Sequence, residues 1–366
     1  MADNKQQHYV PKATLRHFAC DPDRQPKPRL INLINISRGK VVRGASLADQ
    51  CYRDYFYGKD TRVEKALGGA EGYFASLVRK MITTRSIDER DGWHLVQMVS
   101  LQRGRTLRAE QELNGMTDKM IKLFMFNKIG EDDLRRVRIG LEGAARLNVA
   151  QSLAISPMLL DLKRFLIVNE TSVPFVIADN PVVSTNWFGR KNDPRRMVGI
   201  ARSGLQMILP LTPKFALMMH DNNVYNAESD HNVIALANSA EASALNELQW
   251  MNAYQNVYSP PTLEHERVEA LLRIPRPEGS LYEFKRLERL ADDGKFQATD
   301  KDEFSPPSEG VKSELVVHSA RALPRDARLR AVRLRDKAVV FDDGSMASPQ
   351  RDPVWEDKRS HRSCRR

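Results

Sequence analysis

The chain has 366 residues, of which 41% are hydrophobic, so it is long enough for one sizeable core or two smaller ones. No apolar run approaches the roughly 20 residues that span a bilayer, and the first ten residues lack the apolar stretch of a signal peptide. We therefore expect a soluble, cytoplasmic protein with no membrane partner. The three cysteines form no C-x-x-C pair and their number is odd, which favours reduced thiols.

The net charge of +10 favours polyanionic partners such as nucleic acid. The excess of Lys and Arg is shared between residues 1–261 and the C-terminal end, whereas residues 262–310 are acidic. Residues 262–366 contain charge runs and few apolar residues for a core of their own, although VVHSARALPRDARLRAVRLRDKAVVFDD is able to fold back as an extra element. These patterns predict a single α+β domain over residues 1–261 and a charged, partly disordered extension over residues 262–366.

The first elements in chain order are a short helix and a hairpin. Pro11 suits the first turn of a helix that carries Leu15 and Phe18 on one face. The stretch LINLINISRGKVVRG, residues 30–44, predicts two strands joined by a turn at residues 37–40.

A helical block follows, and it ends at Pro157. Ser86 and Glu89 form a capping-box pattern that indicates the start of its second helix. Helical spacing of apolar residues predicts helices over residues 61–83, 86–113, 115–128 and 131–155.

The pattern then changes to short apolar runs bounded by turn residues. They predict a mostly antiparallel sheet followed by one more helix. The expected strands are residues 162–170, 173–183, 204–212, 214–220 and 256–260, and the expected helix is residues 228–254.

His8 is the first candidate for chemistry. It lies just before the stiff Val10-Pro11 step, which would hold it in place beside the first helix. An imidazole in such a position suits a general base or a metal ligand. The alternative is a histidine that bonds to the backbone and fixes the N-terminus, and the local spacing alone favours this second reading.

Asp179 and Asn180 end an apolar run in ADNPVV. A carboxylate at a strand end is well placed to reach a cleft. Asp-Asn and Asn-Pro steps are also typical of turns in which the side chain bonds to the backbone.

The second long helix contains LQRGRT, in which Gln102 and Arg105 share a face. A guanidinium beside an apolar stripe is suited to bind a phosphate or a carboxylate. The alternative without a function is a solvated basic patch. Glu64 and Glu71 are seven apart on the first long helix. They are candidates for metal binding or acid–base chemistry, although exposed helix charges are more common.

Several known motifs are missing from the sequence. There is no G-x-x-x-x-G-K-[ST], G-x-G-x-x-G, H-E-x-x-H or G-x-S-x-G, and no zinc-type spacing of Cys and His. Nucleotide-cofactor and zinc-hydrolase functions therefore have no support from motifs.

The order of HYVPKATLRHF, VEKALGGAEG, QRGRT, ADNPVV, LPLTPKFAL and NVYSP resembles a bacterial family of unknown function, DUF4238, over about residues 7–260. This chain has Thr14-Leu15 where the family favours Tyr-Leu. The resemblance implies a fold more than a reaction. It also implies a shared set of polar positions, which fall here on His8, Glu71, Gln102, Arg105, Asp179 and Asn180.

These residues lead to a first functional hypothesis, metal-assisted hydrolysis of phosphodiesters. His8 would be the general base or a ligand, Asp179 and Glu71 would hold Mg or Mn, and Gln102 and Arg105 would orient the phosphate. The alternatives are a non-catalytic nucleic-acid-binding protein that contacts phosphates through its basic groups and, on the resemblance alone, an accessory protein of a defence or mobile-element locus.

Overall fold

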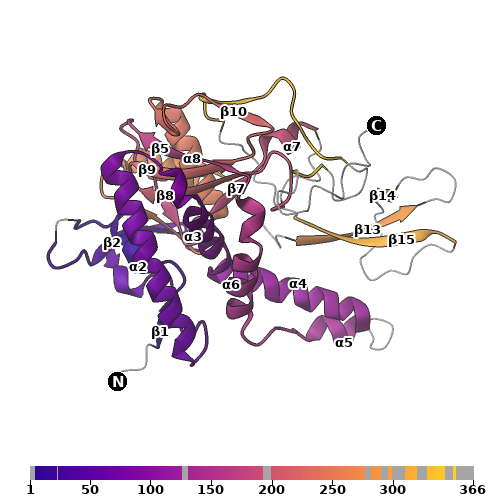
Figure 1. Cartoon of the computed structure of the whole chain (residues 1–366). Coiled ribbons are helices and arrows are strands. Elements are labelled where there is room, and N and C mark those ends of the chain that lie inside the picture. Colours follow the sequence, from indigo (N-terminus) through magenta and orange to yellow (C-terminus); the bar gives the residue numbers. More distant parts are fainter. Residues whose placement is uncertain are drawn as a thin grey trace.

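The structure is a computed structural model that describes residues 5–22, 24–125, 131–192, 199–276, 282–289, 296–298, 310–319, 328–342 and 349–351. Helices and mixed sheets confirm the predicted α+β class (Figure 1). No helix within these ranges is long and apolar enough to cross a membrane. Cys20 and Cys51 are free thiols, and Cys364 lies outside the described residues.

A five-stranded sheet forms the centre of the molecule. Its strands in spatial order are β11 (Val233–Leu236), β5 (Lys163–Asn169), β9 (Phe215–His220), β8 (Gln206–Thr212) and β7 (Val183–Thr185). β11 runs parallel to β5, and the other neighbours are antiparallel, which confirms the mostly antiparallel sheet. A bulge lies between Pro210 and Thr212, where the proline cannot donate to the ladder.

A smaller sheet joins the N-terminal hairpin to the end of the domain. Its strands in order are β3 (Lys40–Ser46), β2 (Leu30–Asn35), β12 (Asn256–Ser259) and β6 (Ile177–Ala178). The hairpin of β2 and β3 confirms the predicted pair of strands, and Gly39 at φ +57° provides the left-handed residue of its turn. A separate two-stranded ladder pairs β1 (Gln6–His8) with β4 (Tyr52–Asp54).

Helices cover both faces of the central sheet. Apolar residues of α2 (Thr61–Thr84) and α3 (Gly92–Gly104) pack on the face that carries Met207, Leu209 and Leu217. On the opposite face, α8 (Ser239–Asn252) packs against alternate residues of the same strands. The short α1 (Lys12–Arg16) contacts α2, and its Leu15 belongs to a third apolar cluster that also contains Ile31 and Leu33 of β2.

The helix predicted over residues 86–113 is wrong in two respects. It begins at Gly92, after a single 3-10 turn capped by Asp88 rather than Ser86. It also ends at Gly104, and α4 (Leu107–Met125) starts anew behind Thr106, whose hydroxyl accepts the N–H of Ala109. The break separates Arg105 from the regular helix on either side.

Two other predicted helices are also interrupted. Residues 131–155 form α5 (Glu131–Arg136) and α6 (Ala144–Ala154), because Gly143 adopts φ +72° between them. In the expected helix over residues 228–254, the β-branched start becomes strand β11, and the helix proper begins behind the cap Asn238.

The chain beyond residue 261 contributes to the same core. The helix α9 (His265–Leu272) buries Val268 and Leu271 there, and β16 (Val332–Leu334) pairs with β10 (Tyr225–Ala227). A three-stranded sheet of β13 (Tyr282–Arg289), β14 (Phe296–Ala298) and β15 (Lys312–Ser319) stands to the right of this body in Figure 1. Residues 352–366 lie outside the described residues.

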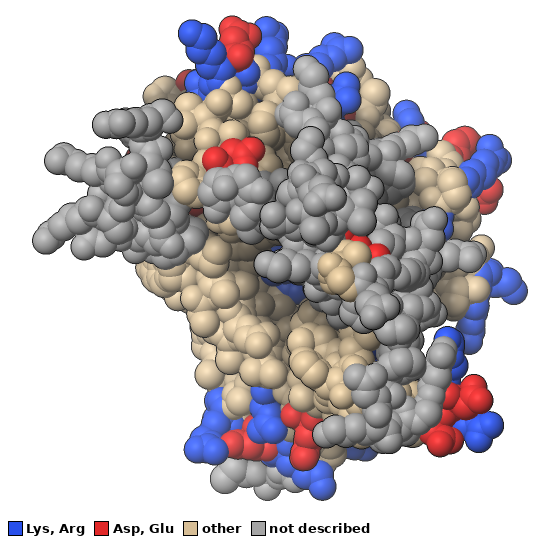
Figure 2. Space-filling view, turned by 90° about the vertical axis from the view of Figure 1, so that its right-hand side faces the viewer, with Lys and Arg blue, Asp and Glu red and all other residues tan. Residues whose placement is uncertain are grey.

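Figure 2 shows how charge is distributed on one face of the molecule. Lys and Arg lie among Asp and Glu along the upper, right-hand and lower edges, and the described residues between these edges are mostly uncharged. On this face the described residues therefore do not form one continuous basic surface.

Candidate functional site

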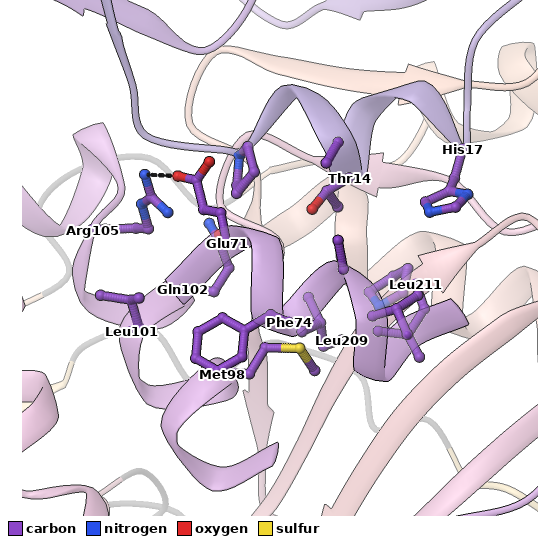
Figure 3. Close-up of a pocket in the computed structure, with 15 residues that line it drawn as sticks. Thr14, His17, Glu71, Phe74, Met98, Leu101, Gln102, Arg105, Leu209 and Leu211 are labelled. Atoms are coloured by element: carbon purple, nitrogen blue, oxygen red, sulfur yellow. Dashed lines mark ion pairs between the residues drawn. The ribbon is translucent and has the colours of Figure 1, made fainter. Parts of the chain in front are cut away.

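A pocket lies where α1, α2, α3 and β8 meet (Figure 3). It encloses about 60 Å³, which is room for roughly four to six water-sized groups. Its walls are mostly apolar and include Phe74, Val78, Met98, Leu209 and Leu211. An apolar cleft with a few polar groups at one end is the usual form of a small-ligand site.

Arg105 is the central polar group of the pocket, and its side chain is only 2% exposed. Its Nη2 lies 2.6 Å from Oε1 of Glu71 and donates to the carbonyl of His8 at 2.7 Å. Its Nε donates to the hydroxyl of Tyr57 at 3.2 Å. The break between α3 and α4 positions this guanidinium, because Arg105 is the C-cap residue of α3. Arg105 is therefore a buried ion-paired residue, not part of a solvated basic patch.

Gln102 lies one turn before Arg105 and lines the same pocket. Its Nε2 donates to the carbonyl of Tyr9 at 3.2 Å. Because a carbonyl only accepts hydrogen bonds, the amide nitrogen must face Tyr9, and the amide oxygen is left on the cavity side. Figure 3 shows Glu71, Gln102 and Arg105 together at one end of the pocket, with Thr14 and His17 farther along.

Glu64 lies near this ion pair, and its side chain is partly buried. Burial, and then the negative charge of Glu71, raise the pKa of Glu64. A raised pKa brings Glu64 closer to its neutral form, so the charge of Arg105 is balanced chiefly by Glu71.

The side chain of His8 bonds to the backbone, as in the second of the two readings of the sequence. It is 7% exposed, and its Nε2 lies 3.1 Å from the carbonyl oxygen of Ala48. Burial, and then the positive charge of Lys12, lower its pKa, so the ring is neutral at neutral pH. The backbone carbonyl of His8, rather than its ring, contacts Arg105.

Asp179 and Asn180 lie at a different junction, between β6, α4 and the end of α8. The Asp179 carboxylate accepts the backbone N–H groups of Tyr254, Gln255 and Asn256 at 2.6–3.1 Å. Burial raises the pKa of Asp179, and these three donors oppose that rise. Asn180 accepts from the Thr106 hydroxyl at 2.9 Å. Neither side chain makes the local backbone bond of an Asx turn in these contacts, because the partners of Asp179 and Asn180 lie more than 70 residues away in the sequence.

The structure thus brings together half of the predicted set. Glu71, Gln102 and Arg105 line one pocket, whereas His8, Asp179 and Asn180 are absent from the residues described as lining it. Across the described parts of the chain, no three His, Cys, Asp or Glu side chains gather in a way that could hold a metal ion.

Several residues that line the pocket were not predicted from the sequence. Thr14 lies on α1 and His17 is the C-cap residue of the same helix, three positions later, and this spacing was the available signal. Leu209 and Leu211 come from a strand more than a hundred residues away from α3. Nothing local in the sequence links them to the pocket.

The fold and the pocket define an α+β protein with a small, partly polar cleft between its helical layer and its central sheet. The chain belongs to the family described as protein of unknown function (DUF4238), which matches residues 6–262. This match confirms the resemblance seen in the sequence. Comparisons with curated proteins and with solved structures gave no match.

Proposed function

We propose that this protein binds a small organic molecule in the pocket between α1, α2, α3 and β8. The observation that carries the proposal is the convergence of Glu71, Gln102 and Arg105 at one end of a cleft with apolar walls. The ion pair and the hydrogen bonds hold Arg105 in place before any ligand arrives, which lowers the entropy cost of binding.

The test is a fragment screen followed by a matched pair of variants. Ala75 lines the pocket on α2, whereas Ala66 lies on the same helix and is exposed. Ala75→Leu adds three carbons to the cavity and should abolish binding of fragments detected by protein-observed NMR. Ala66→Leu makes the same chemical change on the surface and should leave binding intact. A screen without hits, or hits that ignore Ala75→Leu, would refute the proposal.

Phosphodiester hydrolysis remains a second candidate, because Glu71, Gln102 and Arg105 of the set predicted for it share one pocket. A metal held by Asp179 would have to replace three backbone donors, so Glu71 is the better candidate ligand. The test is nuclease activity with Mg or Mn on the native chain, His8→Ala and Glu71→Gln. Equal rates for all three would exclude both side chains from the chemistry.

Nucleic-acid binding without catalysis is tested by its salt dependence. Neutralisation of phosphates makes affinity fall steeply as salt rises. Binding that is absent, or that does not respond to salt, would exclude this alternative.

A further inference from the structure

We infer that the group recognised at the polar end of this pocket is an uncharged primary carboxamide on a short carbon chain. The inference rests on the proposed binding function and adds the chemical class of the ligand. It follows from three properties of Gln102, Glu71 and Arg105: their charge, their free hydrogen-bonding atoms and the space beside them.

The first property is charge. Arg105 is buried, and its positive charge is already balanced by Glu71 at 2.6 Å. An anionic ligand would be drawn to Arg105 but repelled by Glu71, and a cationic ligand would meet the opposite pair of effects. Each charged ligand would also lose its hydration on entering an apolar cleft. The balanced pair therefore favours a neutral ligand.

The second property is a matched donor and acceptor. Among the described residues, Nη1 of Arg105 and the amide oxygen of Gln102 have no hydrogen-bond partner, because the bonds of these side chains use Nε, Nη2 and Nε2. Nη1 of Arg105 can donate a hydrogen bond to a ligand, and the amide oxygen of Gln102 can accept one from it. A carboxamide has a carbonyl for the first and an NH₂ for the second.

Charged groups of the same shape do not satisfy both positions. A carboxylate would place a lone pair against the amide oxygen of Gln102. An amidinium would place an N–H against the guanidinium of Arg105.

The third property is space. The cavity encloses about 60 Å³, and the residues beside its polar end, Leu101 and Phe74 among them, are apolar. A carboxamide on a chain of two or three carbons fills roughly this volume. The carboxamide can belong to a free small molecule or to an asparagine side chain.

The experiment compares probes of nearly equal shape on the native chain by NMR titration: propionamide, propionate, propionamidinium and butanone. Fragments of this size bind weakly, with dissociation constants in the millimolar range. Propionamide should bind about tenfold more tightly than each of the others. Equal or tighter binding of propionate or propionamidinium would overturn the inference. Capped asparagine, compared with propionamide, shows which source of the carboxamide fits better.

Two variants test the assignment of the contacts. Glu71→Gln keeps the shape of the side chain but leaves Arg105 without its counter-charge, so propionate should gain about tenfold relative to propionamide. Gln102→Met removes the acceptor, so propionamide should lose its advantage over butanone. Unchanged ratios in folded variants would overturn the inference.

The outcome for the proposed function is separate. If other fragments occupy the pocket and propionamide does not, the carboxamide assignment fails and the binding function stands. If no fragment binds, the proposed function itself fails.

Discussion

The ion pair of Arg105 and Glu71 should stabilise the fold as well as prepare the pocket. Arg105→Met removes a hydrogen bond to the His8 carbonyl at 2.7 Å, one to Tyr57 at 3.2 Å and the ion pair at 2.6 Å. Loss of one partner of a buried pair costs about 3–5 kcal/mol. Because the Glu71 side chain is 27% exposed and keeps some hydration, we expect the lower end, about 3 kcal/mol.

The measurement is a double-mutant cycle in urea. Glu71→Gln alone keeps an acceptor for Arg105 but leaves its buried charge without a counter-charge, so it should cost about 2–3 kcal/mol. Once Arg105 is absent, the same change should cost only about 1 kcal/mol, which gives a coupling energy of about 1–2 kcal/mol.

Arg103→Met, two residues earlier on α3, is the control and should change the free energy of unfolding by less than about 0.5 kcal/mol. A coupling energy near zero would show that the pair is not formed as described.

Three further predictions concern stability. Burial, and then the charge of Lys163, lower the pKa of His220 to about 4. The unfolded chain therefore binds a proton first, and about 3 kcal/mol of stability, present above pH 6.5, should be lost as the pH falls towards 4; His220→Phe should remove this loss. Asp179→Asn should cost about 2–4 kcal/mol with or without Mg, because the side-chain NH₂ of the asparagine would face a backbone N–H, and two donors cannot bond to each other. Gly104→Ala should cost about 1–3 kcal/mol, because its Cβ would lie 1.9 Å from the Ser152 hydroxyl.

Each of these variants has a matched control. His231 is exposed, so its replacement by Phe should leave the acid-induced loss of stability in place. Asp49 is exposed, and Asp49→Asn should be close to neutral. A Cβ at Gly115 meets nothing within 4 Å, so Gly115→Ala in α4 should be neutral or stabilising. If a variant and its control behave alike in urea unfolding, the contact described for that residue does not stabilise the protein.

The sequence was a good guide to elements whose pattern is local and regular. The hairpin over residues 30–44 and the helix from Thr61 follow from alternation and helical spacing, and both are present. The antiparallel runs after Pro157 are also present. It was a poor guide to helix breaks; at the end of α3, for example, Gly104 packs closely against Ser152 on α6. That packing is a long-range contact.

The sequence by itself determined part of the composition of the site but not its arrangement. It singled out Gln102 and Arg105 beside an apolar stripe and Glu71 on the preceding helix, and these three meet in one pocket, whereas His8, Asp179 and Asn180 of the same predicted set are not among the residues that line it. It could not distinguish a buried guanidinium from a solvated one, since the same letters, QRGRT, allow both.

Only the tertiary structure decided that difference. The carbonyl of His8 and the carboxylate of Glu71 come from other elements, and they become partners of Arg105 only when β1 and α2 fold against α3. The role of Asp179 also depends on the tertiary structure, because the three N–H groups that donate to its carboxylate lie on the chain after α8. A buried polar group takes its role from the partners that surround it, and those partners are distant in sequence.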